Sequence, residues 1–333
     1  MTDALFLTSA EVDDLAEPAD YVAAVRDAYR QVGEGAPAEP RTKLYNREPP
    51  GMLTTYAALL PETGAMGGYT YSAGFGAEDA WFMTPLFDAE SGEPLALLDG
   101  ASMNPFKTGA AGAVAVDALA REDATELAVI GSGAQARGQL ATTATVREFE
   151  AVRVFSPTAE NREAFAADFD ERLDADVSAV ESASDALAGA DVVITATTAS
   201  EPVIDDADVE PGTHVTAMGQ YHPEKNELPP ELVARATYVP DLRARATQDA
   251  GSYLAAVEAG LIEEGEGIAA DLGAVVAGDH PGRTSDEEVT VFDSGGSGVE
   301  TVAAAHMLYK RASEKGRGQT IDFAPASEAL TGE

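Results

Sequence analysis

The segment ELAVIGSGAQARGQL, residues 126–140, has the spacing of a phosphate-binding turn. A short apolar run ends at Ile130, and a glycine-rich turn and helix-forming residues follow. Gly131 permits a tight turn, Gly133 lets the backbone approach phosphates, and Ala136 lets the helix pack closely on the strand. The start of the helix adds free N–H groups and a positive dipole end. We predict that NAD(H) or NADP(H) binds here through Gly131, Ser132, Gly133, Ala134, Gln135 and Ala136, with an ordinary strand-to-helix turn as the alternative.

The end of the next predicted strand, 152–155, bears on the choice between the two cofactors. In NAD-binding folds, an acidic residue about 20 residues beyond the glycines holds the ribose 2′-OH. Ser156 takes that place here, and Thr158 and Arg162 follow it. This pattern favours NADP(H) over NAD(H), with Arg162 pairing with the 2′-phosphate. The alternative is that Arg162 lies at the start of a solvated helix.

Two cations stand out because the chain has only 21 lysines and arginines in total. Arg41 follows a proline-rich loop, and Lys107 lies just before a predicted helix. A carboxylate substrate needs a cation, and arginine offers a bidentate fork. Both are therefore substrate-site candidates, with a surface ion pair as the alternative for each. The four histidines lack metal-ligand spacing, so we predict no metal site.

The secondary structure that must position these residues differs between the first third of the chain and the rest. The N-terminal part is expected to hold a strand at 4–8, helices at 9–15 and 19–32, and antiparallel strands broken by Gly or Pro between 52 and 98. After a helix at 108–119, strands and helices alternate, which predicts a parallel sheet. Its strands are expected at 127–130, 152–155, 192–196, 214–218, 238–240 and 289–292.

The predicted fold class is α/β, with a doubly wound Rossmann sheet inserted into an N-terminal α+β domain. Residues 120–295 form the inserted domain, and 1–119 with 296–333 form the other. A last helix at 299–312 precedes a tail, from Ser313, that is expected to be partly mobile. A crevice between two such domains is the expected place for a substrate.

Composition narrows the possible partners. A formal charge of −37 disfavours nucleic acid and anionic membranes. The chain is 45% apolar, which fits a folded protein from a salt-filled, halophilic cytoplasm better than an acidic disordered chain. With no cysteine, disulfides and thiolate catalysis are excluded. No apolar run reaches the roughly 18–20 residues of a membrane span, and the start of the sequence lacks signal-peptide features, so we predict a cytoplasmic location.

Taken together, the motifs resemble the ornithine cyclodeaminase and mu-crystallin family, which includes an archaeal alanine dehydrogenase and ketimine reductases. The matching segments are PRTK (40–43), ESGEPLALLDG (90–100), FKTGAA (106–111), VIGSGAQARGQL (129–140), TATTASEPV (195–203), MGQYHPEKNEL (218–228) and VFDSGGSGVET (291–301). The resemblance implies a homodimer formed by the N-terminal domains, and hydride exchange at the α-carbon of an amino acid or its imine. It also implies that Arg41 grips the substrate carboxylate, and that segments bordering the cofactor contain Thr197, Met218, Gly219 and Ser294.

Three positions depart from the family pattern. The family's catalytic lysine, in a G-x-K strand motif, corresponds to Thr70 in the stretch 68–70. An arginine in an RTAA-like motif is replaced by Lys107, and the cyclodeaminase's aspartate by Tyr221. Cyclisation of ornithine needs a carboxylate near the side-chain amine, and a tyrosine with an ordinary pKa of about 10 does not supply one.

We therefore predict an NAD(P)H-dependent oxidoreductase acting on a small amino acid, its imine or a 2-oxo acid. The predicted catalytic residues are Arg41, Lys107, Tyr221 and Thr70. Two alternatives remain. One is an ornithine cyclodeaminase that forms proline and ammonia, and the other is a non-catalytic protein that binds NADP(H) or a metabolite.

Overall fold

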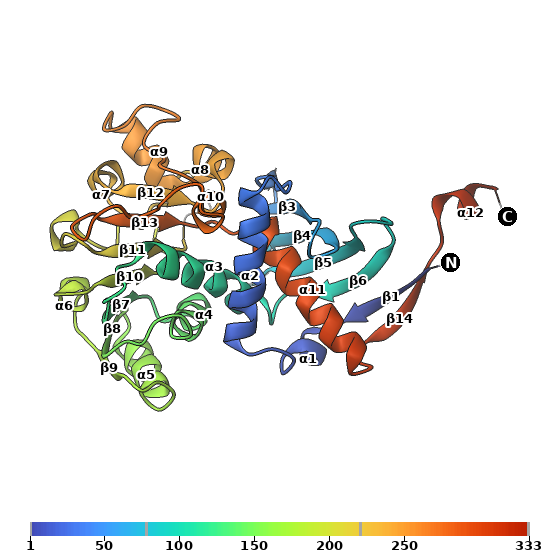
Figure 1. Cartoon of the computed structure of the whole chain (residues 1–333), viewed down its shortest axis with the longest axis horizontal. Coiled ribbons are helices and arrows are strands. Elements are labelled where there is room, and N and C mark those ends of the chain that lie inside the picture. Colours follow the sequence, from blue (N-terminus) through green and yellow to red (C-terminus); the bar gives the residue numbers. More distant parts are fainter. Residues whose placement is uncertain (1, 77–78, 220–221, 332–333) are drawn as a thin grey trace. The chain divides into compact units, whose positions relative to one another are not determined.

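The computed structural model describes residues 2–76, 79–219 and 222–331 (Figure 1). The chain forms two compact units, Met1–Lys107 with Ser297–Glu333, and Thr108–Gly296. The first boundary falls inside helix α3 (Asn104–Leu119), earlier than the predicted boundary after residue 119. The second falls between Gly296 and Ser297, one residue after the predicted position. One parallel and one mixed sheet confirm the predicted α/β class.

The first unit is built on a seven-stranded sheet, sheet A, with the order β14-β1-β6-β5-β4-β3-β2. Neighbouring strands are antiparallel except for β1 and β6, which are parallel. The predicted antiparallel segments between 52 and 98 are confirmed as β3 to β6, whereas β2 was missed. The strands are β1 (Thr2–Leu7), β2 (Thr42–Arg47), β3 (Pro50–Leu60), β4 (Ala65–Gly74), β5 (Trp81–Asp88), β6 (Pro94–Asp99) and β14 (Gln319–Phe323).

Helix α11 (Gly298–Glu314) covers one face of sheet A, which we call the inner face (Figure 1). It contacts β3, β4 and β5, and α2 (Pro18–Gly33) packs against it. Glycine is required at the start of the helix, because a Cβ on Gly298 would lie 2.4 Å from the carbonyl carbon of Ala57. A capping box between Ser297 and Glu300 begins the helix. The remaining helices of this unit are α1 (Ser9–Val12) and α12 (Ala326–Thr331).

The second unit contains sheet B, in which all neighbouring strands are parallel. Its order is β12-β13-β11-β10-β7-β8-β9, so the chain reverses direction across the sheet between β7 and β10. Ligands bind such sheets at the carboxyl ends of the strands, next to this switch point. The strands are β7 (Glu126–Ile130), β8 (Ala151–Phe155), β9 (Asp176–Ala179), β10 (Val192–Thr195), β11 (His214–Ala217), β12 (Thr237–Pro240) and β13 (Thr290–Asp293).

Buried apolar side chains hold the helices of this unit on sheet B. Alternate residues of β7, Ala128 and Ile130, join a core that includes Leu187 of α6, Leu232 of α7 and Tyr253 of α9. The helices of the unit after α3 are α4 (Ala134–Thr143), α5 (Ala159–Asp170), α6 (Ala183–Leu187), α7 (Pro230–Arg235), α8 (Arg243–Asp249), α9 (Gly251–Glu258) and α10 (Leu272–Val276), with a short 3-10 helix, η1 (Asp206–Asp208).

The tail requires a correction. Residues 319–323, expected to be partly mobile, form β14 antiparallel to β1, with Thr320 opposite Leu5. Pairing covers an edge of β1 that would otherwise leave its backbone groups unpaired. The short edge strand β9 was also missed, since its four residues, DVSA, give little apolar alternation. Within the described ranges, no helix is long and apolar enough to cross a bilayer.

Candidate active site

The predicted phosphate-binding turn lies at the switch point of sheet B. Gly131 follows β7 with φ of +124°, a conformation that favours glycine. A Cβ there would lie 2.4 Å from the carbonyl oxygen of Ala196, which follows β10. The N–H of Gly131 donates to the carbonyl oxygen of Phe155, at the end of β8, over 2.8 Å. Gly131 therefore links the ends of β7 and β8 and lets the end of β10 approach closely.

Gly133 plays a different part from Gly131. It is the N-cap of α4, has φ of −80°, and provides no side-chain cap. No atom beyond its immediate neighbours lies within 4 Å of the place where a Cβ would be. The first-turn N–H groups of α4 therefore have no side-chain acceptor at the cap, and the space beside the Gly133 Cα is open. This arrangement fits a pyrophosphate, while buried Ala136 packs the helix onto the sheet.

The end of β8 carries the residues predicted to select the cofactor. The Ser132 hydroxyl donates to the hydroxyl of Ser156 over 2.9 Å, which links the turn to this strand end. Arg162 Nη1 donates to the carbonyl oxygen of Ser156 over 3.0 Å, and its Cζ lies 5.9 Å from the centre of the Phe155 ring. Thr158 is the N-cap of α5 and makes no side-chain cap bond. Ser156, Thr158 and Arg162 therefore gather at one strand end.

Two buried carboxylates hold the other strand-end loops of sheet B. Glu227 accepts from the backbone N–H groups of Thr197 and Gly219, over 2.6 and 2.7 Å. Asp241 accepts from the Ser294 hydroxyl over 3.2 Å and from the N–H of Gly295 over 3.0 Å. Buried Met218 precedes Gly219. The predicted cofactor-bordering residues therefore belong to loops fixed by acids that the sequence reasoning did not single out.

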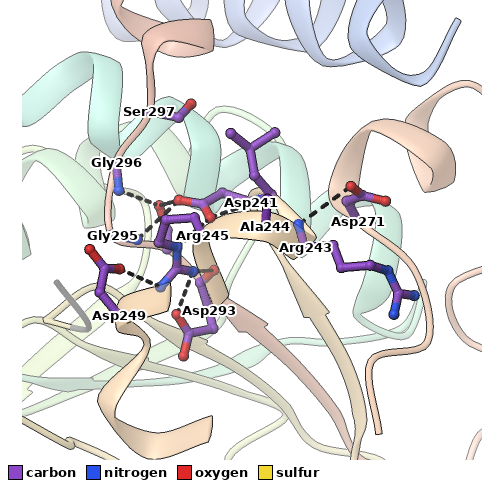
Figure 2. Close-up of polar contacts among 12 residues, drawn as sticks. Asp241, Arg243, Ala244, Arg245, Asp249, Asp271, Asp293, Gly295, Gly296 and Ser297 are labelled. Atoms are coloured by element: carbon purple, nitrogen blue, oxygen red, sulfur yellow. Dashed lines mark hydrogen bonds and ion pairs between the residues drawn. The ribbon is translucent and has the colours of Figure 1, made fainter. Parts of the chain in front are cut away.

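Asp241 is part of a buried ion cluster around Arg245 (Figure 2). Arg245 Nε lies 2.7 Å from Asp241 Oδ1, and its Nη2 lies 2.6 Å from Asp293 Oδ1. Asp249 lies 3.9 Å from Arg245 Nη1. Burial raises the pKa of Asp293 to about 6, although the Arg245 charge opposes this. The cluster ties helix α8 to the end of β13, where the loop containing Ser294 begins.

A second cluster lies on the inner face of sheet A, within the first unit. Lys107, 1% exposed, has its Nζ 3.6 Å from Glu300 Oε1 and 4.8 Å from the centre of the Tyr69 ring. Arg41, 3% exposed, has its Cζ 5.6 Å from the centre of the Tyr56 ring. Tyr56 and Tyr69 are directly opposite in the β3–β4 pairing. We call these five residues the lysine cluster.

The charges of the lysine cluster act on one another. Burial lowers the pKa of Lys107; Glu300 opposes this effect, and the Arg41 charge lowers the pKa further. Burial also raises the pKa of Tyr69. Glu300 accepts hydrogen bonds from the backbone N–H and the hydroxyl of Ser297, over 2.5 and 2.6 Å, so its position is fixed. The structure thus brings Arg41 close enough for its charge to act on Lys107, which is paired with an anchored carboxylate.

The structure corrects the expected position of Thr70. Its hydroxyl lies 3.2 Å from that of Thr55, and it lines a cavity of about 420 Å³ that also contacts Ala57 and Phe87 on the outer face of sheet A. Because side chains alternate along a strand, Tyr69 faces Lys107 and Thr70 points away. The G-x-X spacing is also met one residue earlier, by Gly67, Gly68 and Tyr69.

Other predictions have different outcomes. Tyr221 lies outside the described residues. No group of three or more metal-ligating side chains occurs in the part of the chain that the structure describes. Sequence reasoning missed Glu300 because it forms a helix capping box, and it missed Tyr69 because two consecutive glycines made the register ambiguous.

Comparisons with known proteins agree with this architecture. The model of the ornithine cyclodeaminase/mu-crystallin family matches residues 2–316. Delta(1)-pyrroline-2-carboxylate reductase from Bacillus cereus is 38% identical over 239 residues, which are 72% of this chain and 73% of that protein.

Two solved structures are similar over almost the whole chain. Thermococcus litoralis Delta(1)-pyrroline-2-carboxylate reductase, in complex with NADH and L-proline, has a TM-score of 0.89 and 30% identity, and covers 95% of this chain and 100% of its own. An archaeal alanine dehydrogenase dimer with bound NAD has a TM-score of 0.90 and 31% identity, and covers 97% and 100%. These relatives confirm the predicted enzyme class, an NAD(P)-dependent oxidoreductase. The chain belongs to the ornithine cyclodeaminase/mu-crystallin family.

Proposed function

We propose that this protein is an NAD(P)H-dependent reductase of small imines that carry a carboxylate, with Δ1-pyrroline-2-carboxylate as the first substrate to test. The observation that carries the proposal is the buried pair of cations, Arg41 and Lys107, beside Glu300. This pair occurs in a chain whose other unit has a complete phosphate-binding turn. The names of the relatives support the same substrate class.

Arg41 is the proposed carboxylate ligand. Its guanidinium presents parallel N–H donors that match the two oxygens of a carboxylate. The ring of Tyr56, 5.6 Å from Cζ, orients the guanidinium plane. Holding the carboxylate fixes the position of the imine carbon and nitrogen next to it.

Lys107 is the proposed proton donor. A reduced nicotinamide, when bound, would supply hydride to the imine carbon, and the imine nitrogen would also need a proton. An ammonium with a pKa lowered by burial gives up its proton more readily than an exposed lysine. Glu300, 3.6 Å away, keeps Lys107 charged before the reaction. Tyr69 covers the ammonium with its ring and keeps water away.

NADPH is the proposed preferred cofactor. Ser156 and Thr158 bring no negative charge to the end of β8, and Arg162 lies beside them. The carbonyl contact of Arg162 is one that a 2′-phosphate could replace with a stronger, charge-assisted bond. The similar solved structures hold NADH or NAD, so this preference would distinguish the chain from those two relatives.

A homodimer formed through the outer face of sheet A is also proposed. This face exposes large apolar side chains from β2, β3 and β5, namely Leu44, Leu53, Trp81, Met83 and Phe87. Contiguous apolar surface of this kind marks an interface, and the similar alanine dehydrogenase is a dimer. Sedimentation in molar KCl should give twice the 34.5 kDa chain mass, and a monomer would overturn the proposal.

The deciding experiment follows NADH and NADPH absorbance in molar KCl, a medium that screens the charge of −37. The acceptors are Δ1-pyrroline-2-carboxylate, other cyclic imines, and pyruvate with ammonia. Ornithine with NAD, assayed for proline, runs beside them. Turnover of a carboxylated imine is the expected result. Bound cofactor without turnover of any acceptor would overturn the proposal in favour of a binding protein, and proline from ornithine would overturn it in favour of a cyclodeaminase.

A further inference from the structure

Glu227 is a buried carboxylate that none of the steps above uses. It lies just before α7 and is 1% exposed. Its own backbone is anchored, since its carbonyl oxygen accepts from the N–H of Val203 over 2.9 Å. The next residue, Leu228, donates to the Ser252 hydroxyl over 3.1 Å. The side chain is therefore held in a fixed direction.

Both oxygens of this carboxylate accept hydrogen bonds from the carboxyl ends of two neighbouring strands. Oε1 accepts from the N–H of Thr197, beyond β10, over 2.6 Å. Oε2 accepts from the Thr195 hydroxyl over 3.0 Å and from the N–H of Gly219, beyond β11, over 2.7 Å. One side chain thereby links the two strand-end loops, in addition to the backbone bond from the Met218 N–H to the carbonyl oxygen of Thr195.

The contact with Glu227 requires glycine at position 219. A Cβ on Gly219 would lie 2.6 Å from Cδ of Glu227, so any other residue would displace the carboxylate. The family resemblance placed Gly219 in a segment bordering the cofactor. In the structure, the Cβ side of Gly219 is occupied by Glu227.

The chemistry of the contact requires a carboxylate. Burial raises the pKa of Glu227, and the hydrogen bonds from Thr197, Gly219 and Thr195 oppose that rise. Burying a charged group costs free energy unless hydrogen bonds compensate. A glutamine would be cheaper to bury but accepts through one oxygen only, and its NH2 group would face one of the N–H donors. The acceptor-only group is needed because donors approach both of its oxygens.

We propose that Glu227 is a positioning residue for the nicotinamide half of the cofactor. A doubly wound sheet binds a dinucleotide with its two mononucleotide-binding halves. The turn after β7 and the end of β8 serve the pyrophosphate and the adenosine side, which leaves the ends of β10 and β11 for the nicotinamide side. Glu227 fixes both of these ends at once. The inference rests on the proposed function, because it assumes that the cofactor binds in this orientation.

The test compares the Kd values of two kinds of ligand for the full-length protein in molar KCl. NADH and NADPH carry the nicotinamide, whereas ADP-ribose and its 2′-phosphate lack it. In Glu227→Gln, we expect the Kd of the preferred cofactor to rise about tenfold or more, as for a lost hydrogen bond to a charged group. The Kd of the matching ADP-ribose compound should be unchanged. Glu231→Gln, exposed in the first turn of α7, is the matched control.

A second variant guards against failure of Glu227→Gln to fold. Gly219→Ala keeps residue 227 a glutamate, but the added Cβ displaces its carboxylate. We therefore expect the same selective weakening of NADH or NADPH binding. Unchanged binding of the intact cofactor in both variants would overturn the role of Glu227 and leave the proposed function standing. Equal losses for both ligands would also overturn it, since they would indicate general damage to the unit. If the wild-type protein bound neither NADH nor NADPH, the proposed function itself would fail, and this inference with it.

Discussion

The phosphate-binding turn and the lysine cluster are built from different kinds of group. The turn is six consecutive residues, 131–136, and its proposed ligands are backbone N–H groups at the start of α4. The lysine cluster combines side chains from widely separated parts of the chain, including Arg41, Lys107 and Glu300. Backbone groups are the same whatever the residue, so the turn tolerates change wherever glycine is not required. A side-chain cluster changes its chemistry with every substitution.

This contrast fits the places of the departures predicted from the family resemblance. The turn has the expected glycines, whereas the predicted departures lie elsewhere, at Thr70 in β4, at Lys107 in α3 and at Tyr221. A site made of side chains can change its chemistry while the scaffold remains. Experiments can separate the two sites, because damage to one should leave the other intact.

The largest effect is expected from Lys107→Met, which removes the ammonium but keeps most of the side-chain volume. Loss of the proton donor should lower kcat/KM for imine reduction by about 10²–10⁴-fold. Cofactor binding, measured by titration, should not change. Lys310→Met, on the exposed side of α11, is the control. Wild-type turnover in Lys107→Met would remove Lys107 from the mechanism.

Arg41→Lys should act mainly on the KM of the substrate. A lysine keeps the charge but cannot make the bidentate contact. Losing one charge-assisted hydrogen bond, about 1.5–3 kcal/mol, should raise that KM by roughly 10–100-fold. The KM of the cofactor should remain near its wild-type value. A rise confined to the cofactor KM would contradict the proposed role of Arg41.

The two glycines of the turn should behave differently. Gly131→Ala places a Cβ 2.4 Å from Ala196 O in a positive-φ conformation, so the unit should lose stability, by about 1–3 kcal/mol for the backbone strain alone. Gly133→Ala meets no neighbouring atom and has an ordinary φ, so stability should be kept while cofactor binding weakens. Thermal melts and cofactor titrations distinguish the two. Equal melting temperatures for Gly131→Ala and Gly133→Ala would contradict the different roles of the two glycines.

Arg162→Ala tests the selectivity at the end of β8. Loss of a charge-assisted contact to the 2′-phosphate should weaken NADPH binding about tenfold or more. NADH lacks this phosphate and should bind nearly as before. Fluorescence titration with both cofactors gives the ratio. If NADH and NADPH weakened equally, Arg162 would have no part in the selection.

The smallest effect is a change in pH dependence. Because burial lowers the pKa of Lys107 below its ordinary 10.5, the protonated donor is present below the lowered value. The rate of imine reduction should therefore fall as the pH rises through that value. In Lys107→Arg the guanidinium does not lose its proton in this range, so whatever activity remains should lack this alkaline decline. A decline at the same pH in the variant would assign it to another group.

Local patterns in the sequence predicted the parts of the molecule that depend on consecutive residues. The strand, the glycines and the helix of the phosphate-binding turn follow one another directly in the sequence. The parallel strands of sheet B are short apolar runs separated by polar segments. The prediction of a partly mobile tail was wrong for residues 319–323, because β14 is a strand only through its pairing with β1, which is far away in the chain.

The lysine cluster could be predicted only in part. Arg41 and Lys107 stood out by their rarity in an acidic chain. Glu300, the ion-pair partner of Lys107, has the sequence pattern of a helix-capping residue, and it also caps the helix. Thr70 was assigned to the lysine position from the stretch 68–70, whereas the preceding glycine also permits Tyr69 there, and a glycine pair does not reveal which side chain faces inward. Only the packing of α11 on the strands defines that face.

The sequence by itself determined the alternation of elements, the glycine-rich turn after β7 and the type of each charged residue, because these depend on local backbone geometry and chemistry. The tertiary structure decided which charges meet, namely Lys107 with Glu300, Arg245 with Asp241 and Asp293, and Glu227 with the ends of β10 and β11. Such contacts join residues that are distant in the chain, and burial, which shifts the pKa of Lys107, Asp293 and Glu227, exists only after the chain has folded around them.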